Sequence, residues 1–145
     1  MGISRSKHAV YDLKYHLVWV PKYRAHILGG EVGQYLKEVF QRIAEECEFW
    51  IDTMEVMEDH VHIFVEAPPR YSPSQLVQML KSISAREIFK KFPEVKKQMW
   101  SGMIWNDGYF IRSVGDEVTA DIIRKYIEYQ KHEDESLQLR MFERP

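Results

Sequence analysis

The chain has 145 residues, of which 45% are hydrophobic and 13% aromatic, and its formal net charge is −2 at pH 7. This composition predicts one folded domain spanning residues 1–145 and excludes a disordered chain. Its apolar runs are shorter than the roughly 20 residues that cross a bilayer, so we expect a cytoplasmic protein without a membrane partner. Cys47 is the only cysteine, which excludes an internal disulfide and a cysteine-rich metal site.

The first half of the chain combines strand and helix patterns. Large residues recur at every second position across residues 11–20, which is the period of a strand with one face on a core. Apolar residues then recur every three or four positions up to about Cys47, which predicts an amphipathic helix. Residues 49–57 and 60–67 are predicted strands, and the Glu58-Asp59 turn between them makes a hairpin.

The second half adds two helices and one strand. Ser72-Pro73-Ser74 is typical of a helix start, and this helix is predicted to end near Pro93. A strand is expected within residues 103–114, and a final helix over about 117–133. The order strand, helix, strand, strand, helix, strand, helix predicts an α+β fold. It is a split βαβ, ferredoxin-like or RRM-like sandwich, with an antiparallel sheet, helices on one face, and an additional C-terminal helix.

Charge is distributed unevenly along the chain. Between Glu31 and Asp59 the residues are strongly acidic, so this stretch is expected to avoid a phosphate backbone. Residues 81–97 and the first 28 residues are richer in bases, and the two segments can form one basic footprint. The predicted DNA contacts are Lys22, Arg24, Lys81, Arg86, Lys90 and Lys91. The alternative is that these charges form solvated faces, as charge runs usually do.

Two histidines alternate with valine on the third predicted strand. Successive side chains of a strand point to opposite faces, so His60 and His62 emerge on one side and Val61 on the other. Two imidazoles at this spacing can share one metal ion. The alternative is that they form the polar face of an edge strand, because a His-x-His triplet is common.

Tyr126 and Gln130 stand four residues apart in the predicted last helix, and so lie on the same face about one turn from each other. The Gln130 amide oxygen can serve as a third metal ligand, and the Tyr126 hydroxyl can reach a phosphate near the same ion. A metal that neutralises phosphate charge and a positioned nucleophile suit attack on a phosphodiester. No phosphate-binding loop motif is present, so no nucleotide cofactor is expected. The alternative is a core tyrosine and an exposed glutamine.

Four motifs spread over nearly the whole chain are specific in combination. They are Val18-Trp19-Val20-Pro21-Lys22-Tyr23-Arg24, Asp59-His60-Val61-His62, Tyr109-Phe110 with Ser113-Val114-Gly115, and Tyr126-Ile127-x-x-Gln130. With these motifs the chain resembles the single-tyrosine HUH transposases of the insertion sequence 200/605 type. The resemblance implies that His60, His62 and Gln130 bind a divalent metal, Mg²⁺ or Mn²⁺. It also implies that Tyr126 attacks single-stranded DNA, leaving a 5′-phosphotyrosine and a free 3′-hydroxyl.

The same resemblance implies a prokaryotic, nucleoid-associated enzyme that recognises DNA hairpins near the ends of a mobile element. The family works as a homodimer, often with the tyrosine helix of one subunit completing the site of the other, and Gly115 is placed to act as the hinge. Ligand preference alone favours Mn²⁺ or Zn²⁺ over Mg²⁺ for two imidazoles and an amide. Tyr129 offers a second hydroxyl, although its angular offset from Gln130, about 100° of helix, makes it the poorer nucleophile.

Two other functions compete with this interpretation. One is a non-catalytic nucleic-acid binder, in which Tyr11, Tyr15 and Trp19 stack bases and residues 81–97 hold phosphates. The other is a small metal-dependent hydrolase that uses the two histidines to activate water. Covalent attachment to DNA distinguishes both from a transposase.

Overall fold

The computed structural model describes residues 3–5, 8–99 and 101–129. Its main sheet has the strand order β4 (Trp50–Met57), β5 (His60–Glu66), β3 (Lys14–Trp19) and β6 (Phe110–Val114). Each neighbouring pair of strands is antiparallel. The predicted α+β sandwich with an antiparallel sheet is therefore confirmed.

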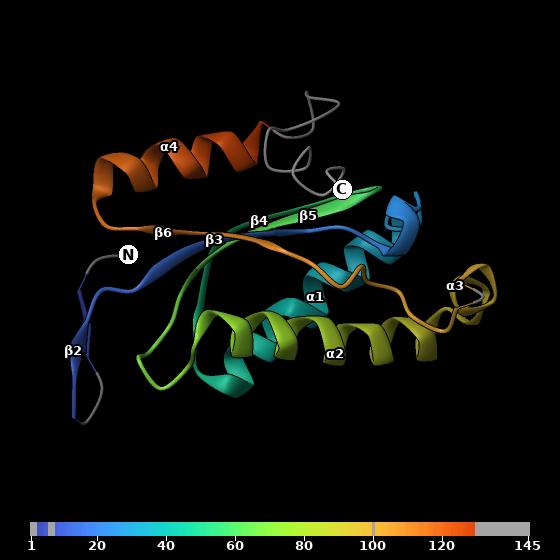
Figure 1. Cartoon of the computed structure of the whole chain (residues 1–145), viewed down its shortest axis with the longest axis horizontal. Coiled ribbons are helices and arrows are strands. Elements are labelled where there is room, and N and C mark those ends of the chain that lie inside the picture. Colours follow the sequence, from blue (N-terminus) through green and yellow to red (C-terminus); the bar gives the residue numbers. More distant parts are fainter. Residues whose placement is uncertain (1–2, 6–7, 100, 130–145) are drawn as a thin grey trace.

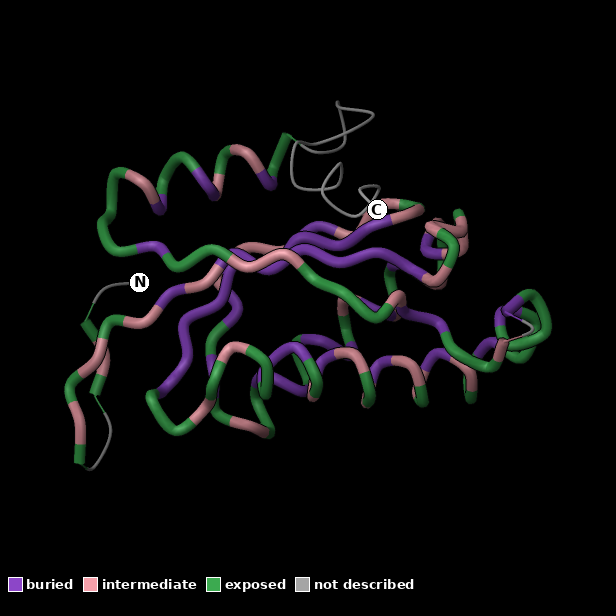
Figure 2. The backbone as a smooth tube through the Cα atoms, viewed as in Figure 1, coloured by how far each residue is buried: buried purple, intermediate pink, exposed green. Residues whose placement is uncertain are grey.

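Helices cover both faces of the sheet (Figure 1). Helices α1 (Gly30–Cys47) and α2 (Pro73–Lys91) pack on one face, and the last helix, α4 (Glu117–Glu128), packs on the other. Strand β5 lies between β4 and β3 and is buried at all seven residues, as Figure 2 shows. The alternative that its histidines lie on an exposed edge strand is therefore wrong, because β5 is central and covered on both faces.

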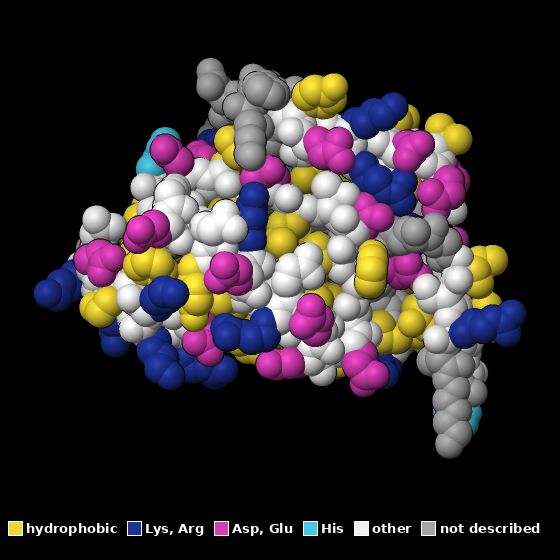
Figure 3. Space-filling view, turned by 180° about the vertical axis from the view of Figure 1, so that it is seen from behind, with side chains coloured by type: hydrophobic (Ala, Val, Ile, Leu, Met, Phe, Trp, Pro, Cys, Tyr) yellow, Lys and Arg dark blue, Asp and Glu magenta, His cyan; other side chains and the backbone are white. Residues whose placement is uncertain are grey.

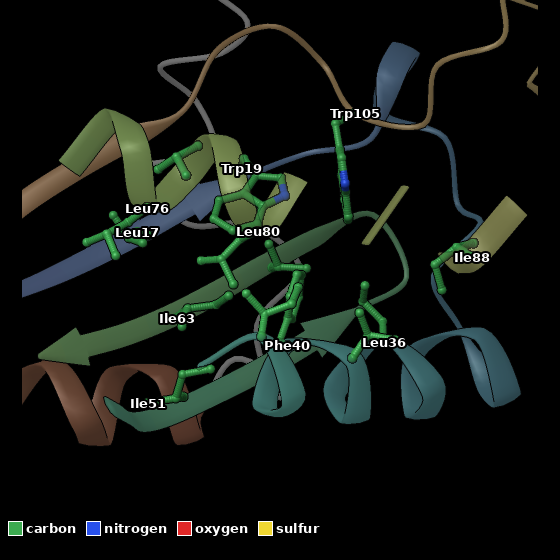
Figure 4. Close-up of a cluster of buried hydrophobic side chains, with 14 of the residues drawn as sticks. Leu17, Trp19, Leu36, Phe40, Ile51, Ile63, Leu76, Leu80, Ile88 and Trp105 are labelled. Carbon is green, nitrogen blue, oxygen red and sulfur yellow. The ribbon is translucent and has the colours of Figure 1, made fainter. Parts of the chain in front are cut away.

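The larger core lies between the sheet and helices α1 and α2 (Figure 4). Trp19 is fully buried there, and its ring meets the edges of Phe40 and Trp105 at centroid distances of 5.9 Å. Tyr15 packs against the same cluster. Tyr15 and Trp19 therefore contribute to the core, and the hypothesis that Trp19 belongs to a base-stacking platform is wrong.

Local capping fixes where two of the helices begin. At α2 the Ser72 hydroxyl accepts a hydrogen bond from the Gln75 amide, and the Gln75 side chain accepts one from the Ser72 amide, which forms a capping box before Pro73. At α4 the Asp116 carboxylate accepts a hydrogen bond of 2.7 Å from the Thr119 amide. None of the helices in the described residues is long and apolar enough to cross a membrane.

Two features depart from the predicted elements, namely a divided first strand and an additional short helix. The first strand is divided, because Tyr11 pairs with Ser4 in a small N-terminal hairpin of β1 (Ser4–Arg5) and β2 (Val10–Tyr11). Helix α2 ends at Lys91, and Pro93 then opens an unpredicted short helix, α3 (Pro93–Gln98). Helix α4 ends at Glu128, and the remainder of the predicted helix over 117–133 lies largely outside the described residues.

Candidate active site

The two histidines of β5 lie together beneath α4. His60 and His62 are 2% and 0% exposed, and their ring centroids are 5.1 Å apart with the planes at 83°. The pair sits on the face of the sheet that packs against α4, because alternate residues of β5 point to that face. The predicted geometry of two adjacent imidazoles on one face is therefore present.

His60 is hydrogen bonded to Asp59, which also pairs with Arg24. The His60 Nδ1 atom lies 2.8 Å from Asp59 Oδ1, and Arg24 Nε donates to Asp59 Oδ2 at 3.1 Å. The hydrogen bond with His60 lowers the pKa of Asp59, and the charge of Arg24 adds to this effect against the opposing effect of burial. The ionised Asp59 carboxylate therefore accepts a hydrogen bond from the Nδ1–H of His60.

Arg24 reaches Asp59 from an unusual backbone conformation. It belongs to the short 3-10 turn η1 (Lys22–Arg24), where Tyr23 and Arg24 have φ values of 60° and 50°. Positive φ is costly for residues with a side chain, and such strain gathers at functional sites. Arg24, which was predicted to contact DNA, thus forms an ion pair with the Asp59 carboxylate that holds His60.

His16 on β3 holds His62, and sequence reasoning did not identify it as part of the site. The His16 Nε2 and His62 Nδ1 atoms are 3.0 Å apart, and the rings stack at 5.3 Å with planes 18° apart. His16 is fully buried, and burial together with the nearby Arg112 charge lowers its pKa to about 4. It is therefore neutral at pH 7. The sequence pattern that could have identified His16 is strand alternation, which puts it on the face opposite to Tyr15 and Leu17.

Tyr126 approaches the histidines from α4. Its ring centroid lies 5.6 Å from that of His62 and 6.1 Å from that of His16, both in edge-to-face arrangements. The tyrosine is half-buried, so part of its side chain faces solvent. The structure therefore brings the predicted nucleophile to the histidine pair of its own chain.

Helix α4 is held in this position by apolar and ionic contacts. Ala120, Ile123 and Ile127 pack against Phe64 and Val114 on the sheet. Arg124 Nε donates to Asp52 Oδ1 on β4 at 2.9 Å, and Lys14 Nζ on β3 lies 3.6 Å from Glu117 Oε1. These contacts fix the height and rotation of Tyr126 above the histidines.

Gly115 joins β6 to α4 without strain. Its φ is outside the positive range, and a Cβ added there would meet no atom within 4 Å. The conformation thus suits other residues as well, and the hinge function of Gly115 stays a prediction.

The nitrogen donors fit a divalent metal. Metal-bound histidines coordinate through one ring nitrogen while the other donates to a neighbouring acceptor. Asp59 and His16 engage the Nδ1 atoms of His60 and His62, so in a metal site Nε2 would be the coordinating nitrogen of each. Within residues 3–5, 8–99 and 101–129, no three His, Cys, Asp or Glu side chains form a group that could hold a metal ion. The predicted third ligand, Gln130, lies outside these residues.

The predicted DNA contacts fall into two groups. Lys22 and Arg24 lie in η1, near the β4–β5 turn. The remaining four lie on α2, which covers the sheet face opposite to the histidines: Lys81, Arg86, Lys90 and Lys91. Figure 3 shows Lys and Arg side chains gathered at the end of the molecule where α2 runs into α3, and mixed charges elsewhere on that view.

Lys81 differs from the other basic residues of α2. Its Nζ donates to the carbonyl oxygens of Asn106 and Gly108 at 2.7 and 2.8 Å, and so anchors the loop before β6. Burial lowers its pKa to about 8, opposed by the charge of Asp107. Arg86 and Lys90 are exposed, and the exposed Lys91 places its Nζ 4.2 Å from the centre of the Tyr35 ring. Lys81 is therefore less available to a phosphate than Arg86 or Lys90.

A helical tyrosine beside a His-x-His pair on this sandwich suits attack on a phosphodiester, and comparison with known proteins identifies the class as a DNA transposase. The chain belongs to the IS200-like transposase family, because the model of that family matches residues 9–130. It is 41% identical over 130 residues to the ISDra2 transposase TnpA of Deinococcus radiodurans, covering 90% of this chain and 92% of that protein. The transposase for insertion sequence element IS200 of Salmonella typhimurium is 30% identical over 135 residues, covering 92% and 88% of the two chains.

Solved structures agree with this assignment. A Deinococcus radiodurans crystal structure described as a transposase candidate superposes with a TM-score of 0.71 and 37% identity, covering 88% of this chain and 97% of that one. A REP-associated tyrosine transposase bound to a REP hairpin has a TM-score of 0.60 and 14% identity, covering 89% and 73%. The second likeness shows the shared fold.

Proposed function

We propose that this transposase cleaves and rejoins single-stranded DNA through a covalent 5′-phosphotyrosine on Tyr126. The observation that carries the proposal is the approach of the Tyr126 ring to within 5.6 Å of His62, inside a site where both histidines of β5 are held through Nδ1. Two buried, oriented imidazoles beside a tyrosine hydroxyl support metal-assisted attack on a phosphodiester.

The reaction is an in-line phosphoryl transfer. The Tyr126 Oη atom attacks the scissile phosphorus, a bond forms between them, and the bond from phosphorus to the 3′ oxygen breaks. The phenol loses one proton in this step, and the leaving 3′ oxygen gains one to become a hydroxyl. Attack by a second 3′-hydroxyl reverses these changes and joins the strands, and because the phosphotyrosine retains the energy of the broken bond, no nucleotide cofactor is needed.

His60, His62 and Gln130 are the proposed ligands of a divalent metal, Mg²⁺ or Mn²⁺. When bound, such an ion supplies charge neutralisation at the non-bridging phosphate oxygens. Asp59 and His16 keep the two imidazoles oriented, while the apolar contacts of α4 keep Tyr126 beside them.

Hairpin DNA at the ends of a mobile element is the proposed partner. The REP-associated tyrosine transposase, which shares the fold, is bound to a hairpin. The C-terminal ends of α4 and α2 point in the same direction along the molecule (Figure 1), and we propose that bound DNA extends from the α4 side toward the basic residues of α2. We further propose that the enzyme is a homodimer that works at the prokaryotic nucleoid, in the cytoplasm. Each active site combines Tyr126 with the histidines of the same chain or of the partner.

The polarity of the covalent bond tests the proposed function. A single-stranded hairpin substrate is labelled at its 5′ end or at its 3′ end and mixed with the protein and Mn²⁺. After denaturation, only the 3′-labelled strand should remain attached to protein, because Tyr126 keeps the 5′ phosphate of the downstream fragment. Attachment of the 5′-labelled fragment would contradict a 5′-phosphotyrosine, and cleavage without any attachment would favour a metal-dependent hydrolase.

The salt dependence of hairpin binding tests the basic residues of α2. Lys90→Met should reduce the magnitude of the negative slope of log affinity against log salt concentration by about 0.7 to 0.9, the values for one lost phosphate contact on single-stranded and duplex DNA. Lys81→Met should leave the slope near its wild-type value, because the Lys81 Nζ atom already serves two backbone carbonyls. Fluorescence anisotropy at several salt concentrations gives both slopes. Equal decreases in the two variants would show that Lys81 contacts DNA.

A further inference from the structure

His16 occupies a fixed position diagonal to His62 on the sheet. In the pairing of β3 with β5, Val18 is opposite His62 and His16 is opposite Phe64, so the two histidines point to the same face from neighbouring strands. The Nε2 atom of His16 lies 3.0 Å from the Nδ1 atom of His62. The edges of Phe110 and Tyr126 contact the His16 ring at centroid distances of 6.2 and 6.1 Å, which restrict its rotation.

The direction of this hydrogen bond decides which nitrogen of His62 can coordinate a metal. A neutral imidazole carries one proton, so a histidine that coordinates through Nε2 must carry its proton on Nδ1. His62 would then donate its Nδ1 proton to the unprotonated Nε2 of His16. In the reverse arrangement His16 would donate to Nδ1 of His62, whose own proton would occupy Nε2 and block coordination.

We propose that His16 is a positioning residue whose Nε2 accepts a hydrogen bond from the Nδ1–H of His62 and thereby directs the His62 Nε2 lone pair to the metal. This inference rests on the proposed metal site. The Nδ1 atom of His16 is buried and has no hydrogen-bond partner among the described residues. No neighbour there donates a hydrogen bond to Nδ1, which would force the His16 proton onto Nε2. His60 receives the equivalent support from the Asp59 carboxylate.

Two variants of His16 separate hydrogen bonding from packing. His16→Phe keeps a flat ring between Phe110 and Tyr126 but has no acceptor, whereas His16→Gln places an amide oxygen near the position of Nε2. Binding of Mn²⁺ alone to the full chain, followed by electron paramagnetic resonance, should weaken about 10- to 100-fold in His16→Phe, the usual effect of losing such a partner. His16→Gln should restore most of the affinity.

The outcomes distinguish this inference from the proposed metal site. Failure of the wild-type chain to bind Mn²⁺ would overturn the metal site itself. Wild-type affinity in a folded His16→Phe chain, or equal losses in both variants, would overturn the role of His16 as an acceptor. A measurement on the wild-type chain covers the case of a variant that does not fold. With Zn²⁺ bound, ¹⁵N resonances should place the protons of both His16 and His62 on Nδ1, and a proton on His16 Nε2 would contradict the proposal.

Discussion

Tyr126→Phe is expected to abolish the covalent protein–DNA adduct and to reduce strand cleavage by on the order of 10⁴-fold or more, because loss of a catalytic nucleophile has effects of that scale. Only the hydroxyl is removed, and the ring can keep its edge contacts with His16 and His62. The variant should therefore fold and bind hairpin DNA as the wild type does. A denaturing gel with labelled hairpin DNA and Mn²⁺ measures the adduct and the cleaved strand together.

Tyr129→Phe is the matched control for this experiment. Tyr129 lies three residues further along, at the C-terminal cap of α4, and is 60% exposed. Its hydroxyl is the only other phenol near the end of the described part of α4, and its loss should leave adduct formation unchanged. The roles would be reversed if the adduct persisted in Tyr126→Phe and disappeared in Tyr129→Phe. Hairpin binding without cleavage by the wild type would instead favour a non-catalytic binder.

His62→Ala is expected to weaken Mn²⁺ binding by more than roughly 100-fold, beyond the range for losing an outer hydrogen-bond partner of a ligand. Cleavage should fall with metal occupancy, and excess Mn²⁺ should restore part of it. The substitution also removes a buried ring, so its thermal unfolding must be followed alongside a calorimetric titration with Mn²⁺. Both measurements need the variant to be folded at the titration temperature.

His8→Ala provides the comparison for His62→Ala, because His8 is an exposed histidine before the small β2 strand. It should bind Mn²⁺ as the wild type does. Unchanged Mn²⁺ affinity in a folded His62→Ala chain would remove His62 from the metal site. Equal losses in the two variants would point to nonspecific binding of Mn²⁺ by surface histidines.

Periodicity in the sequence predicted most of the sandwich. Strand and helix patterns are local, and the hairpin of β4 and β5 follows from two apolar runs joined by a two-residue turn. The short helix α3 was missed because Pro93 is as suitable for starting a helix as for ending one. The division of the first strand at Tyr11 depends on pairing with Ser4, which alternation within residues 11–20 does not reveal.

The candidate site was only partly predictable. Strand period correctly placed His60 and His62 on one face, and helix period placed Tyr126 on an apolar face of α4. His16 was missed because its partnership with His62 depends on the register between β3 and β5, which joins residues 46 positions apart. Arg24 was assigned to DNA from its charge alone, and its contact with Asp59 appears only when η1 meets the β4–β5 turn.

The order of the elements along the chain has a consequence during synthesis. Strands β3 and β5, which carry the buried histidines His16, His60 and His62, emerge from the ribosome well before α4. At roughly 5–20 residues per second, translation from the end of β5 to Tyr126 takes several seconds, and domains begin to fold during this time. A nascent chain therefore contains His16, His60 and His62 before Tyr126 has been synthesised. If Tyr126 is the nucleophile, as proposed, such a chain cannot cleave DNA by itself until the last helix has been added.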